Sequence, residues 1–175
     1  MSTQNTDYSH YSWFRSIFRP DELQQLVKRS ITMLKAFHKE TPFDAMAFTG
    51  MSGAMLAPIL SYELQIPMIM VRTEHEASMC SKAPASGFTK FKSYIIVDDL
   101  VLSGNTLGHI HAAVCEFCEC SLAPHDMQTY KPELVGVALY DSHFDGDTID
   151  NYRSPIDKDL PVIQLWDETT ASKAA

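Results

Sequence analysis

The stretch Tyr94-Ile95-Ile96-Val97-Asp98-Asp99-Leu100-Val101-Leu102-Ser103-Gly104-Asn105-Thr106 decides the fold of this chain. Its first four residues are apolar or aromatic, which is typical of a strand buried on both faces of a parallel sheet. Two adjacent carboxylates follow, and then a short polar turn opens a helical pattern. This order predicts a buried strand, a polar site at its carboxyl end, and a helix that begins directly after the site.

The polar part of this stretch has two halves with different chemistry. Asp98 and Asp99 can accept hydrogen bonds from sugar hydroxyls or hold a hydrated Mg²⁺. The turn offers backbone N–H groups and a helix N-terminus, both of which favour a phosphate. A phosphorylated sugar would satisfy both halves. A purely structural alternative is a strand end followed by a helix that Ser103 or Asn105 caps.

Strand and helix patterns alternate on both sides of this stretch. An aromatic N-terminal segment precedes a helix of about 18 residues that begins at Pro20, where two acidic residues favour a helix N-terminus. We expect further strands at residues 43–49, 66–71, 134–140 and 161–165, and helices at residues 53–64 and 106–119. The alternation predicts an α/β fold: a mostly parallel, five-stranded sheet with helices on both faces.

Length and composition indicate one domain. The chain has 175 residues, of which 45% are hydrophobic, enough for a sheet and two helical layers. We divide it into an N-terminal helical and aromatic segment (1–42), an α/β core (43–166) and a tail (167–175). No apolar run reaches about 18 residues and the first residues are polar, so we expect a cytoplasmic protein without a membrane span.

The charge balance limits the ligands. The formal net charge of −8 argues against binding to nucleic acid through charge. An anionic ligand would therefore need a metal ion, backbone dipoles and a few basic side chains. Four basic residues are grouped around residues 73–91, a long connection without a clear element of its own: Arg72, Lys82, Lys90 and Lys92. A connection of this length in a compact domain is usually functional or disordered.

A second candidate anion site follows the first expected strand. It consists of Thr49, Gly50, Met51, Ser52 and Gly53, and a helical pattern begins directly after it. Glycines let a backbone approach an anion closely, and the helix N-terminus behind them favours negative charge. Because the carboxyl ends of parallel strands meet at one sheet edge, we expect this turn to lie near the acid pair.

The four cysteines allow two interpretations. They are Cys80, Cys115, Cys118 and Cys120. The last three, with His111 one helical turn earlier, could hold zinc. Their spacing, however, falls inside a helical pattern and lacks paired loop-borne Cys-x-x-Cys motifs, which favours free, buried or half-buried thiols.

The stretch 94–106 resembles the phosphoribosyl-diphosphate signature of the type I phosphoribosyltransferases. That signature has four apolar residues, two acids, two apolar residues and a Thr/Ser-Gly-x-Thr-like loop, matched here by residues 94–97, 98–99, 100–101 and 102–106. The resemblance implies a phosphoribosyltransferase-like fold with a small hood or lid. It also implies transfer of 5-phosphoribosyl from phosphoribosyl diphosphate to a nucleobase nitrogen, with Mg²⁺ as cofactor, in a cytoplasmic homodimer.

The same resemblance implies roles for individual residues. Asp98 and Asp99 would hold the ribose 2′ and 3′ hydroxyls, directly or through metal-bound water. The 5′-phosphate would lie against Leu102, Ser103, Gly104, Asn105 and Thr106. The diphosphate would lie against Thr49, Gly50, Met51, Ser52 and Gly53, with Arg72 nearby. Residues 73–91 would form a lid that brings Lys82 or His75 to the diphosphate.

Two departures narrow the expected activity. Members that act on 6-oxopurines carry an acidic general base where this chain has Leu102, so the orotate-like and adenine-like branches are closer. Arg72 is followed by Thr73-Glu74-His75-Glu76, whose acids would repel a diphosphate. The alternative is therefore a regulatory protein that binds phosphoribosyl diphosphate without turnover, and a third possibility is another α/β protein with an incidental acid pair.

Overall fold

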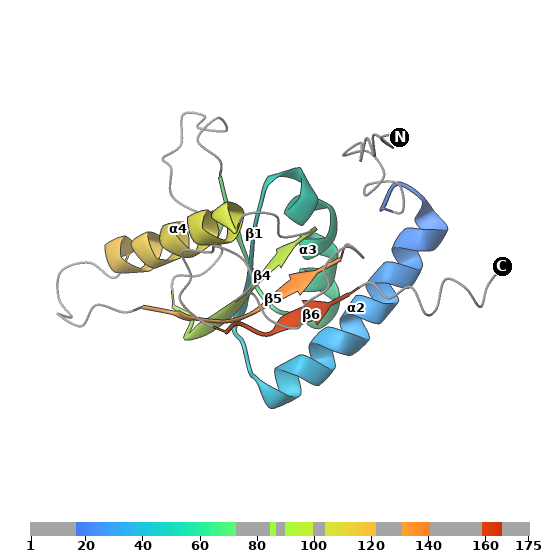
Figure 1. Cartoon of the computed structure of the whole chain (residues 1–175), viewed down its shortest axis with the longest axis horizontal. Coiled ribbons are helices and arrows are strands. Elements are labelled where there is room, and N and C mark those ends of the chain that lie inside the picture. Colours follow the sequence, from blue (N-terminus) through green and yellow to red (C-terminus); the bar gives the residue numbers. More distant parts are fainter. Residues whose placement is uncertain are drawn as a thin grey trace, which may run out of the picture.

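The computed structural model describes residues 17–72, 85–86, 90–99, 104–121, 131–140 and 159–165 (Figure 1). Its helices are α2 (Pro20–Glu40), α3 (Gly50–Leu64) and α4 (Asn105–Ser121). Its strands are β1 (Ala45–Thr49), β2 (Met68–Val71), β3 (Ala85–Ser86), β4 (Ser93–Asp98), β5 (Glu133–Leu139) and β6 (Val162–Gln164). None of the helices in these ranges is long and apolar enough to cross a membrane.

The strands form one sheet in the order β3-β2-β1-β4-β5-β6. All neighbouring pairs from β2 to β6 are parallel, and β3 runs antiparallel to β2 at the edge. The prediction of a mostly parallel α/β sheet is confirmed, and the five predicted strands are the parallel ones. The sixth, β3, was not predicted, because two residues carry no readable pattern.

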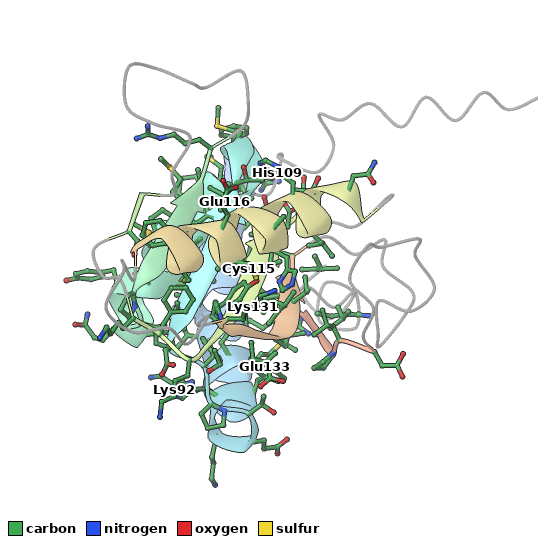
Figure 2. The ribbon with its side chains drawn as sticks, turned by 90° about the vertical axis from the view of Figure 1, so that its left-hand side faces the viewer. Lys92, His109, Cys115, Glu116, Lys131 and Glu133 are labelled. Carbon is green, nitrogen blue, oxygen red and sulfur yellow. The ribbon has the colours of Figure 1, made fainter. Side chains whose placement is uncertain are left out.

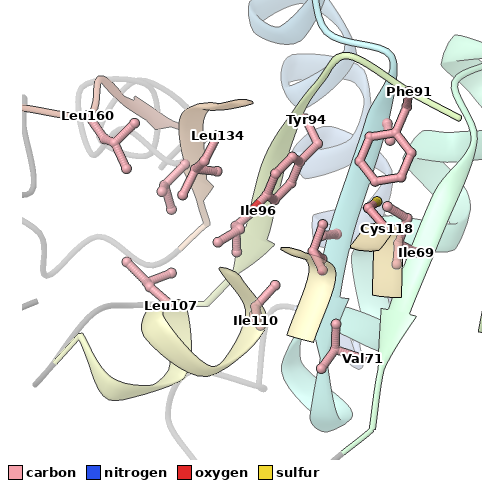
Figure 3. Close-up of a cluster of buried hydrophobic side chains, with 14 of the residues drawn as sticks. Ile69, Val71, Phe91, Tyr94, Ile96, Leu107, Ile110, Cys118, Leu134 and Leu160 are labelled. Atoms are coloured by element: carbon pink, nitrogen blue, oxygen red, sulfur yellow. The ribbon is translucent and has the colours of Figure 1, made fainter. Parts of the chain in front are cut away.

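The helices cover both faces of the sheet. Alternate residues of β1 point to opposite sides, with Ala45 and Ala47 in one apolar cluster and Met46 and Phe48 in the other. The first cluster includes the inner face of α4, and Figure 3 shows its side chains between this helix and the strands. The second includes the inner faces of α2 and α3, which lie on the other side of the sheet in Figure 1. This is the doubly wound arrangement that the alternating pattern indicated.

The helix that begins at Pro20 is also confirmed. α2 has Pro20 at its start, acidic residues in its first turn and basic residues in its last turn, as the charge distribution of a helix favours. It contains 21 residues, slightly more than expected. The first 16 residues and residues 166–175 lie outside the described ranges, so the division of the chain into segments stays a prediction.

Candidate functional site

The strand order places a topological switch point between β1 and β4, and we call the region outside the carboxyl ends of these two strands the crevice. From β1 the chain continues to β2 on one side, and it later returns to β4 on the other side of β1. α3 follows β1 on one face of the sheet, and α4 follows β4 on the other. In open α/β sheets, ligands bind outside the carboxyl ends of the strands at such a switch point. Thr49 and Asp98 are the last residues of these two strands.

The turn after β1 is tighter than we expected. The helix was predicted to begin at Gly53, after a turn at residues 50–52, but α3 already begins at Gly50. The positive φ of +62° at Gly50 turns the chain sharply, so that the helix follows the strand without a loop. The glycines and Ser52 therefore form the first turn of α3, and the backbone N–H groups of that turn have no partner within the helix.

Thr49 has a structural role in the sheet. Its side chain is 7% exposed, and its hydroxyl donates to the carbonyl of Val71 at 2.7 Å. This bond joins the carboxyl ends of β1 and β2. Met51, by contrast, is 67% exposed in the first turn of α3.

A hydrogen-bond network fixes Asp98 at the crevice. The Ser52 hydroxyl donates to Asp98 Oδ1 at 2.9 Å, and the Asp99 backbone N–H donates to the same oxygen at 3.0 Å. The Tyr140 hydroxyl, just after β5, donates to the Ser52 carbonyl at 2.8 Å. The ends of β4 and β5 and the start of α3 are thus tied together. Tyr140 and Ser52 have supporting roles that the sequence did not reveal.

The two carboxyl groups of the acid pair differ in exposure. Asp98 is 4% exposed, whereas Asp99 is half-buried. Burial, and then repulsion by Asp99, raise the pKa of Asp98 from its ordinary 3.8 to about 7, although the hydrogen bonds from Ser52 and the Asp99 backbone lower it. Asp98 is therefore a positioned internal group, and Asp99 is the more accessible carboxylate for a ligand.

The start of α4 supplies the second helix N-terminus. Gly104 has a φ of +74° and is buried directly before the helix, and Asn105 and Thr106 are exposed in the first turn. Only residues 100–103 separate Asp99 from Gly104 in the chain, so this turn begins close to the acid pair. Leu102 and Ser103 lie outside the described residues. The described part of the predicted phosphate loop thus has the backbone expected for an anion site.

Arg72 lies directly after β2, the strand on the other side of β1 from β4, and is half-buried. Its carbonyl oxygen lies 3.3 Å from His109 Nε2 of α4, and Figure 2 labels His109 on this helix. The contact connects α4 with the point where residues 73–91 leave the sheet. His109 was not predicted, although its position one helical turn after Thr106 could have suggested it. Lys82 and His75 lie outside the described residues.

The acid pair suits Mg²⁺ better than zinc. Mg²⁺ prefers oxygen ligands and usually keeps several waters, so one or two protein carboxylates with substrate oxygens suffice. The described residues contain no group of three His, Cys, Asp or Glu side chains that could hold a metal ion on their own. Asp98 and Asp99 therefore fit a hydrated Mg²⁺ that a substrate completes.

The Ser52 hydroxyl should control the ionisation of Asp98. We expect Ser52→Ala to raise the pKa of Asp98 further and to destabilise the fold by about 1–2 kcal/mol at pH 8, where the carboxylate loses a donor. Carboxyl ¹³C NMR titration and urea unfolding measure both effects. Ser61→Ala is the matched control, since Ser61 lies on the same helix and donates to the Ile66 carbonyl instead. An Asp98 titration that is the same in both variants would contradict the assignment.

This chain is similar to known proteins in structure, and not in sequence. No protein-family model matches the sequence, and no curated protein sequence matches it. An adenine phosphoribosyltransferase structure is similar with a TM-score of 0.59 and 17% identity, over 86% of this chain and 84% of that one. The adenine phosphoribosyltransferase of Saccharomyces cerevisiae, in complex with an imino-altritol bisphosphate and adenine, is similar with a TM-score of 0.57 and 18% identity. The match covers 86% of this chain and 82% of that one.

Orotate phosphoribosyltransferase from Aeropyrum pernix is also similar, with a TM-score of 0.56 and 12% identity over 91% of this chain and 78% of that one. At these identities the likeness concerns the fold. The chain has the fold of the orotate and adenine phosphoribosyltransferases. The resemblance seen in residues 94–106 is thus confirmed at the level of the fold, and the similar structures are of the expected adenine and orotate enzymes.

Proposed function

We propose that this chain transfers a 5-phosphoribosyl group from phosphoribosyl diphosphate to a ring nitrogen of a nucleobase and releases diphosphate, with Mg²⁺ as cofactor. The observation that carries the proposal is the convergence of an acid pair and two helix N-termini at the β1–β4 switch point. Sugar hydroxyls, a 5′-phosphate and a diphosphate require this combination of acceptors and donors. A cytoplasmic homodimer is part of the same proposal.

Each part of the crevice has a role in this reaction. The bond between C1′ of the ribose and the diphosphate oxygen breaks toward an oxocarbenium-like centre, so negative charge accumulates on the leaving group. The N-terminus of α3 and the Arg72 side chain would stabilise that charge. Asp99 would accept hydrogen bonds from the ribose hydroxyls, while Asp98 would orient the turn through Ser52. The N-terminus of α4 would hold the 5′-phosphate.

Asp98 and Asp99 are the residues that would hold Mg²⁺, either directly or through its water molecules. When bound, the ion would neutralise part of the diphosphate charge, which an acidic chain with a net charge of −8 needs. Residues 73–91, including Lys82, would close over the diphosphate and exclude water. The base would be orotate-like or adenine-like, in agreement with Leu102 at the position where 6-oxopurine enzymes carry an acid.

A second candidate function is binding of phosphoribosyl diphosphate without turnover. It is favoured by Glu74 and Glu76 directly after Arg72, because their charges oppose a diphosphate. Diphosphate release with a panel of nucleobases, with and without Mg²⁺, separates the two functions. Release with one base supports the enzyme. Mg²⁺-dependent binding without release from any base supports the regulatory protein.

Asp99→Asn should weaken ligand binding while leaving the fold intact. We expect calorimetry to show phosphoribosyl diphosphate binding about 10- to 100-fold more weakly in the presence of Mg²⁺, because a charged acceptor for hydroxyls and metal-bound water is lost. Thermal unfolding of the free protein should not occur at a lower temperature, since Asp99 is half-buried and the substitution removes its repulsion of Asp98.

Glu63→Gln is the control for this experiment, since it removes an exposed carboxylate near the far end of α3. Its affinity should equal that of the native chain. If Asp99→Asn also bound phosphoribosyl diphosphate with native affinity, the acid pair would not be part of the binding site. No stabilisation of the native chain by the ligand in a thermal shift would argue for an incidental acid pair.

A further inference from the structure

The backbone of Arg72 lies just beyond the hydrogen-bonded part of the sheet. The pairing of β2 with β1 ends at Val71, opposite Thr49. β1 does not continue further, because the φ of +62° at Gly50 turns the chain into α3. On the other side of β2, the pairing with the described residues of β3 reaches Met70. The carbonyl groups at this end of β2 therefore need partners other than a neighbouring strand.

Two side chains from different elements supply these partners. The Thr49 hydroxyl from β1 donates to the Val71 carbonyl at 2.7 Å. The Arg72 carbonyl lies 3.3 Å from Nε2 of His109 on α4. A carbonyl oxygen can only accept, so the imidazole carries a hydrogen on Nε2 and donates it. Two consecutive carbonyl groups are thus held, one from β1 and one from α4.

These two hydrogen bonds fix the direction in which the Arg72 side chain leaves the backbone. The Val71 carbonyl belongs to the peptide group before the Arg72 Cα, and the Arg72 carbonyl belongs to the peptide group after it. Each peptide group is planar, so holding both restricts φ and ψ of Arg72 and the direction of its Cα–Cβ bond. A long guanidinium side chain loses rotamer entropy when it binds a phosphate group, and a fixed starting direction reduces that cost.

His109 also lies on the helix that carries the expected 5′-phosphate site. It follows Asn105 by four positions and Thr106 by three, so the three residues share one side of the first turns of α4. The start of α4 would hold the 5′-phosphate, and His109 holds the backbone of the residue that would meet the diphosphate. A short segment of one helix therefore sets the position of both ends of the ligand.

The contact is of little use for the stability of the fold. The His109 side chain is exposed, and its bond to the Arg72 carbonyl is at the long end of the normal range. Exposed hydrogen bonds of this kind contribute little to the free energy of unfolding. An effect of His109 on ligand binding can therefore be measured without unfolding the protein.

We propose that His109 is a positioning residue for the diphosphate side of the reaction. It holds the Arg72 backbone so that the guanidinium is directed to the diphosphate, and it does not contact the ligand itself. The inference rests on the proposed function, because it takes Arg72 as the cation that meets the diphosphate.

A matched pair of substitutions tests the role of His109. A glutamine amide reaches the position of Nε2, so His109→Gln keeps the donor to the Arg72 carbonyl. An asparagine amide reaches only the position of Nδ1, so His109→Asn loses that donor. In calorimetry with Mg²⁺, we expect phosphoribosyl diphosphate to bind about 3- to 10-fold more weakly to His109→Asn and within about twofold of native to His109→Gln. Ribose 5-phosphate should bind equally to all three chains, and their urea midpoints should agree.

A double-mutant cycle tests whether His109 acts through Arg72. Arg72→Ala removes the guanidinium and keeps the backbone carbonyl. In the Arg72→Ala chain, His109→Asn should weaken the binding of phosphoribosyl diphosphate by less than about twofold, because the group that His109 positions is already gone. A purely structural role of His109 would give the same loss of affinity in both backgrounds.

The outcomes separate this inference from the proposed function. If the native chain binds phosphoribosyl diphosphate and His109→Asn binds it equally well, or loses the same factor in both backgrounds, the positioning role is wrong and the proposed function stands. A loss of ribose 5-phosphate affinity in His109→Asn would also overturn the inference, since His109 would then contact the 5′-phosphate end. A native chain that does not bind phosphoribosyl diphosphate overturns both.

Discussion

Asp98→Asn should strongly reduce the proposed phosphoribosyl transfer and at the same time make the free protein more stable at pH 8. The rate of the proposed transfer is expected to fall at least about a hundredfold, because the variant loses the carboxylate that holds Ser52 and that would help to hold the proposed Mg²⁺. The folded state becomes more stable because a buried charge disappears. The amide oxygen of the introduced asparagine can still accept from Ser52 and from the Asp99 backbone. Its NH₂ group can donate to the Asp99 carboxylate, where the native carboxylate repels it.

The direction of the pH dependence follows from the pKa of Asp98. Its value of about 7 in the folded protein lies above the ordinary 3.8, so between these values the folded state binds more protons than the unfolded state. The free energy of unfolding of the native chain therefore falls as pH rises from about 4 to about 7, by at most about 4 kcal/mol. An asparagine at position 98 does not titrate, so the free energy of unfolding of Asp98→Asn does not fall for this reason as the pH rises.

Urea unfolding of the metal-free protein at pH 5 and pH 8 measures the effect. The gain of Asp98→Asn over the native chain should be larger at pH 8 by about 2–3 kcal/mol. Asp44→Asn is the control, because the exposed Asp44 carboxylate accepts two backbone N–H groups at the opposite end of the sheet. The free energy of unfolding of that variant should not exceed the native value at either pH. An equal gain for Asp98→Asn at both pH values would mean that burial does not raise the pKa of Asp98 in the folded protein.

The sequence predicts the framework of the site well, because the framework depends on local patterns. The apolar run before Asp98 predicts β4, and the polar turn after it predicts α4. Strands that alternate with helices predict a parallel sheet, and a parallel sheet brings the acid pair and the turn after β1 to one edge. The fold and the neighbourhood of the candidate residues follow from these rules.

The contacts inside the site could not be predicted in the same way. Ser52 lies 46 positions before Asp98 and 88 positions before Tyr140, and no local pattern shows that the three side chains meet. The start of α3 was predicted three residues late, at Gly53, because Gly50 suggests a turn by residue type. Only the backbone shows that Gly50 makes a single sharp turn and is itself the first residue of the helix.

Gly53→Ala should strongly destabilise the protein, although alanine is the better helix former by about 1 kcal/mol. A Cβ atom at position 53 would lie 2.5 Å from the Cβ of Phe48 in β1, and 3.1 Å and 3.2 Å from two of its ring atoms. The Phe48 Cβ is fixed to the backbone of a buried strand, so no rotamer change relieves the overlap. The first turn of α3 would have to move away from β1, and Ser52 would move away from Asp98 with it.

We therefore expect Gly53→Ala to lose about 3 kcal/mol or more in urea unfolding, and to bind phosphoribosyl diphosphate more weakly where it still folds. Gly50→Ala is the matched variant, since a Cβ at position 50 has no neighbour within 4 Å and only its φ of +62° opposes alanine. It should cost about 1–2 kcal/mol. If Gly53→Ala were as stable as the native chain, α3 could not approach β1 as closely as the structure shows, and the helix N-terminus would not be held at the edge of the crevice.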